Sequence, residues 1–253
     1  MNEPGQIPNG KLGSDFFERE IGLTQSLSTV FIDELEIPGD FPANAYASIR
    51  KLVSAREGNN PLYSHYVGAW NAIPYRFLAA AESGEEFARL VQKHGVGPER
   101  FYRYLQERAI FEFFSCGFSV LEASFYALYT MGALIQPMNF QISTEKDRRR
   151  VNLRRTEESF RTHFSSDPIV PLLSQILNDQ GYKELCEVRN ILTHQVVLGR
   201  HFSLSRSHAA QWELNGVRVD FGVSTFVKYR AELVRIMDVL MTGMDRFSAV
   251  YFV

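Results

Sequence analysis

The sequence predicts an all-α protein, a helical bundle with one small β-hairpin at about residues 211–220, before the C-terminal helix. Apolar residues recur at intervals of three and four through most of the chain, which is the period of a helix with one buried face. The run from Ala123 to Thr144 carries no charge and is typical of a central helix. Asn215-Gly216 separates two short alternating segments and favours a two-residue hairpin turn.

The N-terminal part is expected to hold a flexible leader followed by helices. Residues 1–13 are rich in glycine and proline. Residues 14–95 form a helical part to which the sequence assigns no role, with helices expected at about 15–36, 42–56, 62–81 and 84–94. Pro38-Gly39 and Gly95 mark breaks between these segments.

Residues 96–253 are expected to form the main bundle, either as a separate domain or packed with residues 14–95. Pro98 favours a helix start, and Pro137 ends the longest apolar run. Further helices are expected at about 168–178 and 180–198. The C-terminal helix is expected to begin near Ser224.

Composition excludes several classes of protein. The net charge is −2, so no chain-wide basic field exists for a polyanion, and nucleic-acid contact must be local. Two cysteines outside any CxxC pair indicate neither a disulfide framework nor a thiolate metal cluster. No cofactor motif occurs, so we expect no cofactor and no metal site. The N-terminus resembles no signal peptide and the apolar run contains polar residues, so we expect a cytoplasmic protein without a membrane span.

A basic cluster follows the apolar run. Between Lys146 and Arg155 the only acid is Asp147. The cluster is a candidate for local phosphate contacts with RNA, and equally for a solvated loop and helix face. Its candidate RNA-binding residues are Arg148, Arg149, Arg150, Arg154 and Arg155.

The expected helix at 180–198 carries the one specific motif, Arg189-Asn190-Ile191-Leu192-Thr193-His194. In a late helix of a helical chain it resembles the Arg-x4-6-His motif of the HEPN superfamily (higher eukaryotes and prokaryotes nucleotide-binding), in which a polar residue often follows the arginine. The spacing alone carries little weight, because Arg89 and His94 share it. What distinguishes the later copy is Asn190 and the long apolar helix upstream.

Helical spacing separates the two ends of the motif. With 100° per residue, Leu185, Val188 and Leu192 form a core stripe that Arg189 flanks. Glu187, Asn190 and His194 share the opposite side. Arg189 and His194 therefore converge only if the arginine reaches around the helix, if the helix is distorted, or if a second subunit completes the site. Members of the family often dimerise through this helix, so the resemblance implies a homodimer.

Glu122 stands alone among apolar residues of the expected long helix. A buried glutamate needs a partner, and Arg189 is a suitable one. That pairing is either structural or part of the site, and we group Glu122 and Glu187 as supporting residues. Without the resemblance, Arg189 is an ordinary ion-pair partner and His194 an ordinary solvated residue.

The resemblance implies a metal-independent endoribonuclease of toxin or defence type, with Arg189, Asn190 and His194 as catalytic residues. RNA and an antitoxin or other protein would be its partners. The alternative is a catalytically silent HEPN-like module that binds a nucleotide, an RNA or a protein. A third hypothesis, an unrelated scaffold with an accidental motif, predicts a monomer in which Arg189 pairs with an acid in the core.

Overall fold

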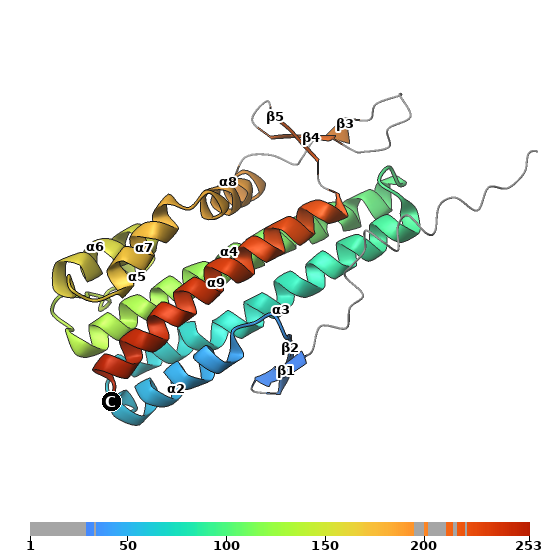
Figure 1. The fold of residues 1–253 in the computed structure, drawn as a ribbon. Coiled ribbons are helices and arrows are strands. Elements are labelled where there is room, and N and C mark those ends of the chain that lie inside the picture. Colours follow the sequence, from blue (N-terminus) through green and yellow to red (C-terminus); the bar gives the residue numbers. More distant parts are fainter. Residues whose placement is uncertain (1–28, 33, 195–199, 202–210, 215–216, 221) are drawn as a thin grey trace, which may run out of the picture.

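The structure, a computed structural model, describes residues 29–32, 34–194, 200–201, 211–214, 217–220 and 222–253. For His194 and for the strands between 200 and 220 it describes the backbone alone. Four helices run side by side in Figure 1: α2 (Ala43–Glu57), α3 (Tyr63–His94), α4 (Arg100–Ile135) and α9 (Val223–Tyr251). Four further helices lie along one side of them: α5 (Glu145–Arg149), α6 (Leu153–His163), α7 (Ile169–Asn178) and α8 (Gln180–His194).

The predicted fold class is confirmed, including the small hairpin before the last helix. Strands β4 (Gln211–Leu214) and β5 (Val217–Asp220) pair antiparallel, with Trp212 opposite Val219. A short strand, β3 (Arg200–His201), pairs with β4 and adds a third strand. The Asn215-Gly216 turn itself lies outside the described residues.

One expected helix is wrong in the part that the structure describes. Residues 29–36, assigned to a helix over 15–36, lie instead in the hairpin of β1 (Thr29–Ile32) and β2 (Leu35–Pro38). Ile32 and Ile37 are buried while Phe31 is exposed, so the period is two rather than 3.6. The turn residue Glu34 has a φ of 70°, which a helix does not allow. The leader and the rest of that expected helix lie outside the described residues.

Other helix boundaries in the structure differ from the predicted ones for local reasons. The expected helices at 62–81 and 84–94 are one helix, α3, because Gly84 lies in close contact with Phe113 and Phe226 and does not end it. The basic stretch after residue 145, to which the sequence analysis assigned no helix bounds, forms α5 and the start of α6. Thr144 and Asp147 make a capping box for α5, and the Asn152 side chain accepts a hydrogen bond from the N–H of Arg155 at the start of α6.

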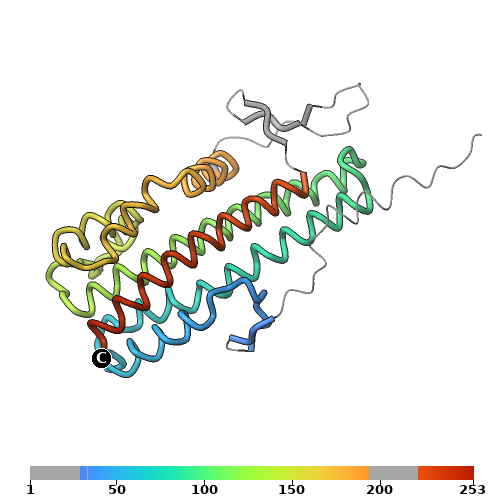
Figure 2. Tube along the Cα trace, in the orientation of Figure 1, coloured from blue at the N-terminus to red at the C-terminus, as the bar shows by residue number. Residues whose placement is uncertain are grey.

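The core is built around α4. α3 packs antiparallel to it, so that Ala80 lies against Gly117 and Gly84 against Phe113. α9 runs parallel to it, with Phe226 against Phe113 and Leu233 against Gly117. The trace in Figure 2 shows the same arrangement, in which residues 43–94 and residues 100–135 lie in one bundle. Helices on both sides of the expected boundary near residue 95 thus share one core.

α4 is also the one described helix long and apolar enough to cross a membrane by length and composition. Most of its apolar window is buried inside the bundle. The residues that make it hydrophobic, such as Phe114, Leu121 and Leu128, contact other helices and not the surroundings. This is the burial expected of the central helix that the uncharged run predicts.

Gly132→Ala is expected to destabilise the fold. A Cβ at residue 132 would lie 2.6 Å from the Phe140 ring, which is fully buried and packs on Tyr129, Phe160 and Phe164. Overpacking of this kind lowers the free energy of unfolding by about 1–3 kcal/mol. The matched control is Gly68→Ala at an exposed position of α3. A Cβ there meets nothing within 4 Å, and helix propensity improves by up to about 1 kcal/mol. Chemical denaturation measures both, and equal stability of the two variants would contradict the packing argument.

Candidate functional site

A pocket of about 750 Å³ opens between α4, the start of α6 and α8. Its wall from α4 consists of Phe118, Glu122 and Phe125. Five residues that the sequence singled out line it together: Glu122, Arg154, Glu187, Arg189 and Asn190. These residues are separated by up to 68 positions in the chain, so their convergence is a result of the fold and not of motif spacing.

Arg189 is fixed in the pocket by two contacts with α4. Its guanidinium carbon lies 4.3 Å from the centre of the Phe118 ring, a cation–π distance. Its Nη2 donates to Glu122 Oε1 at 2.5 Å. The long side chain thereby leaves the core stripe of α8 and reaches across to α4.

Glu122 does not behave as a core acid. Its side chain is 48% exposed, whereas that of Arg189 is 20% exposed. The sequence prediction of a pair between these residues is confirmed, but the expectation that Glu122 is buried is wrong. Because position 122 lies on the face of α4 that meets the pocket, its carboxylate remains open to solvent and to ligands. This differs from the core pairing that the accidental-motif hypothesis predicts.

The polar face of α8 opens into the same pocket. Glu187 and Asn190 both line it, and Asn190 Nδ2 contacts Cys186 Sγ at 3.6 Å one turn earlier. Leu185 and Val188 are buried in the core, and the buried Ile191 lies at the edge of the pocket. His194 is the last residue of α8, and its side chain lies outside the described residues. Its position on the face of Asn190 therefore remains a prediction from helical spacing.

The basic cluster divides between different environments. Arg148 donates to the carbonyl groups of Ile142 and Ser143, and Arg149 pairs with Glu145 within α5. Arg155 Nε donates to the hydroxyl of Tyr129 at 3.4 Å. Arg150 is exposed at the end of α5. Arg154 is the member of the cluster that lines the pocket.

Sequence reasoning missed the pocket residues that carry no motif. Tyr182, Lys183 and Cys186 of α8 line it, and Tyr182 packs on the rings of Phe118 and Phe125. Partial burial raises the pKa of the Cys186 thiol, although Arg189 works in the opposite direction. The thiolate form of Cys186 is therefore less favoured than that of an exposed cysteine. The sequence could have indicated these pocket residues, because they share a face of α8 with Glu187.

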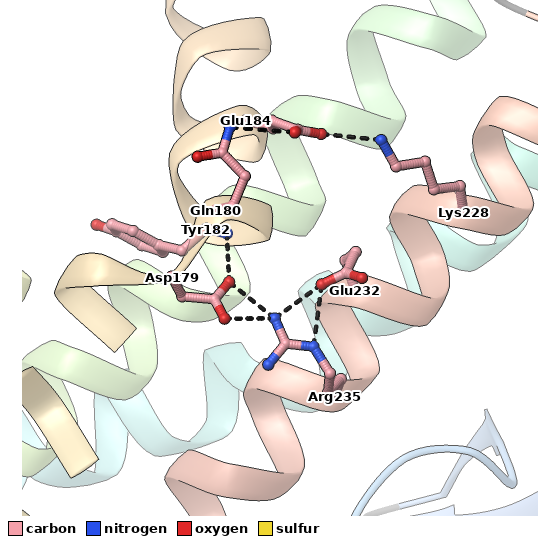
Figure 3. Close-up of polar contacts among 7 residues, drawn as sticks. All are labelled: Asp179, Gln180, Tyr182, Glu184, Lys228, Glu232 and Arg235. Carbon is pink, nitrogen blue, oxygen red and sulfur yellow. Dashed lines mark hydrogen bonds and ion pairs between the residues drawn. The ribbon is translucent and has the colours of Figure 1, made fainter. Parts of the chain in front are cut away.

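Ion pairs hold α8 against α9, as Figure 3 shows. Asp179 caps α8 by accepting from the N–H of Tyr182 at 2.9 Å, and both its oxygens accept from Arg235 at 2.7 Å. Arg235 also pairs with Glu232. Further along, Lys228 pairs with Glu184 at 2.9 Å. A Cβ at Gly181 would overlap the Glu232 carboxylate, so this glycine permits the close approach.

Among the described residues, no group of three or more histidine, cysteine and carboxylate side chains is placed to hold a metal ion. The pocket instead combines cations, acids, an amide and aromatic rings. Such a set can bind a phosphate through Arg189 or Arg154 and a planar ring against apolar side chains. Comparisons of this chain with protein-family models, with curated proteins and with solved structures give no match.

Asp179→Asn is expected to destabilise the protein near neutral pH and to weaken its acid sensitivity. Burial alone would raise the pKa of Asp179, but the hydrogen bonds from Tyr182 and Arg235 lower it below its ordinary value of 3.8. The carboxylate therefore stabilises the fold above that value, and the stabilisation disappears as the pH falls through the lowered pKa.

The measurement is the free energy of unfolding of the wild type and of Asp179→Asn, from neutral pH to below pH 3.8. The difference between the two free energies should become smaller as the pH falls. Glu86→Gln is the control, because it breaks an exposed ion pair within α3 and should change stability by less than about 1 kcal/mol. A difference for Asp179→Asn that stays constant across this range would rule out the linkage.

Proposed function

We propose that this protein is an HEPN-like, metal-independent endoribonuclease, and that the pocket between α4 and α8 holds the RNA at the scissile phosphate. The observation that carries the proposal is that Arg189 and Asn190 line one pocket together with Glu122 and Arg154. The pocket thus brings a guanidinium, an amide and a second arginine to one place, which is what a site for a phosphate needs. The homodimer and the toxin or defence role are parts of the same proposal.

The chemistry needs few groups, because RNA supplies its own nucleophile. His194 is the proposed general base or acid, since an imidazole exchanges protons near neutral pH. As a base it would take the proton of the 2′-hydroxyl while the 2′-oxygen attacks phosphorus. The bond to the 5′-oxygen breaks, that oxygen takes up a proton, and the products are a 2′,3′-cyclic phosphate and a 5′-hydroxyl.

Arg189 would neutralise charge on the phosphate oxygens in the transition state. A guanidinium suits this role because it is planar, permanently charged and able to donate several hydrogen bonds. In the structure its direction is set by Phe118 and Glu122, so it needs little reorganisation when a phosphate arrives. Asn190 would orient His194 one turn later on the same face.

A silent binding module is the second candidate, and the ion pair with Glu122 favours it. A guanidinium that already donates to a carboxylate has part of its charge neutralised before any phosphate binds. In a module that only binds a nucleotide, an RNA or a protein, that pair would be permanent and Glu122 would itself contact the ligand. Cleavage separates the two candidates.

His194→Ala and Arg189→Ala are each expected to lower RNA cleavage in EDTA by at least about 100-fold. This is the usual contribution of a general acid–base group for His194 and of a charge-stabilising donor for Arg189. The control is Arg89→Ala, which alters the same Arg-x4-His spacing on α3, where Arg89 is exposed and pairs with Glu86. It should cleave as the wild type does. A labelled oligonucleotide followed on a denaturing gel gives the rates, and cleavage that persists in His194→Ala would sink the nuclease proposal.

Glu122→Gln is expected to separate binding from catalysis. Removing the negative charge frees the charge of Arg189, so affinity for an uncleavable RNA should rise by a few-fold, as expected from about 1 kcal/mol. The neutral amide holds the guanidinium less firmly, so the rate of cleavage at saturating RNA should fall. Glu86→Gln, in the exposed pair with Arg89 on α3, is the control. Unchanged affinity together with unchanged rate would show that Glu122 is only structural.

A further inference from the structure

The N-terminal part of α4 carries exposed aromatic side chains that the fold does not use. Phe101, Tyr104 and Phe111 are 63%, 55% and 43% exposed. α9 meets α4 only from about Phe113 onward, so α3 and α4 project beyond the bundle as a pair, as Figure 1 shows. Large apolar side chains gathered on one exposed face commonly mark a binding surface. We call these three residues the aromatic stripe.

The aromatic stripe shares its face of α4 with the pocket. At 100° per residue Phe101, Tyr104 and Phe111 fall within about 80° of one another, and Phe118 and Glu122 fall within the same sector or 20° beyond it. The stripe is about 15 Å long, and Glu122 lies about 16 Å further along the axis. Bulky exposed rings therefore lead along one helix to the residues that hold Arg189.

We propose that the aromatic stripe is a stacking platform for single-stranded RNA whose strand continues into the pocket. The course of the strand toward the pocket rests on the proposed function, whereas binding of RNA to the stripe does not. Aromatic side chains stack on every base regardless of sequence, with about 1–3 kcal/mol per base. The distance from Phe101 to Glu122 along α4 is about 30 Å. This suits a single strand of about 4 to 16 nucleotides, the length that stacking surfaces of proteins bind.

The charges along the stripe fit stacking better than a phosphate track. Arg100 is exposed beside Phe101, and Arg108 lies between Tyr104 and Phe111. Arg108 pairs with Glu112 at 3.5 Å, and Glu99 precedes the helix, so the local charge is nearly balanced. The rings must then supply most of the affinity, and the salt dependence contributed by the stripe is expected to be small.

A second copy of this chain fits the stripe less well. Two copies joined by antiparallel stripes would cross near residue 107, about 22 Å from Glu122 in each copy. Their pockets would then lie about 45 Å apart. Such a dimer brings no partner residue to either pocket, whereas RNA connects the stripe with the pocket of the same chain.

The test compares binding of a 2′-O-methyl oligonucleotide of about 12 residues, which lacks the nucleophile, to wild-type and variant protein. Replacing Phe101, Tyr104 and Phe111 together by leucine keeps apolar surface but removes the rings. We expect at least a 10-fold loss of affinity, equivalent to the stacking of about one base. Tyr75→Leu is the control, because Tyr75 is 65% exposed but lies on α3, and it should leave affinity unchanged.

The single variants Phe101→Leu, Tyr104→Leu and Phe111→Leu serve if the triple variant does not fold, and each should lose affinity by a few-fold. Phe101→Trp should keep it. Unchanged affinity in the leucine variants overturns the proposal, as does an equal loss in Tyr75→Leu. Conversion of a dimer to a monomer with unchanged RNA affinity would assign the stripe to a second copy. Because uncleavable RNA is used, an inactive wild-type protein would end the nuclease proposal without affecting this test.

Discussion

The burial of α4 is the constraint on which the rest of the structure depends. A helix that carries Phe113, Leu121 and Leu128 on different sides needs neighbours on nearly every side. α3, α9, α6 and α8 supply them, and each of these helices is amphipathic with its apolar face toward α4. Features that look separate in the sequence are thus arranged around a single axis.

Two interruptions in that burial coincide with the candidate site and the aromatic stripe. One is the pocket, where α8 approaches α4 without covering Glu122, because the intervening space is bridged by the side chain of Arg189. The other is the end of α4 beyond α9, where no helix of the described part of the chain covers the aromatic stripe. Exposed phenylalanine adds little to folding, so stability alone does not explain the aromatic stripe.

The sequence predicted the long helices better than the short elements, and the reason is physical. In α4 and α9 many turns of apolar spacing reinforce one another, so the helical period stands out. In residues 29–38 only a few apolar residues are available, and Val30, Ile32 and Ile37 fit a helix nearly as well as a hairpin until their partners are known. α5 is five residues long and depends on the Thr144 cap, which no periodicity reveals.

The same distinction explains the candidate site. The Arg189–Glu122 pair could be predicted because an acid inside an apolar run and an arginine beside a core stripe each need a partner. The exposure of Glu122 could not, because it depends on how far α8 stands from α4, and that distance is set by Tyr182 against Phe118 and by the Asp179–Arg235 anchor. The pocket volume is therefore a property of contacts made by residues outside the motif. A substitution at that anchor should alter the pocket by shifting α8, even though neither residue of the anchor lines it.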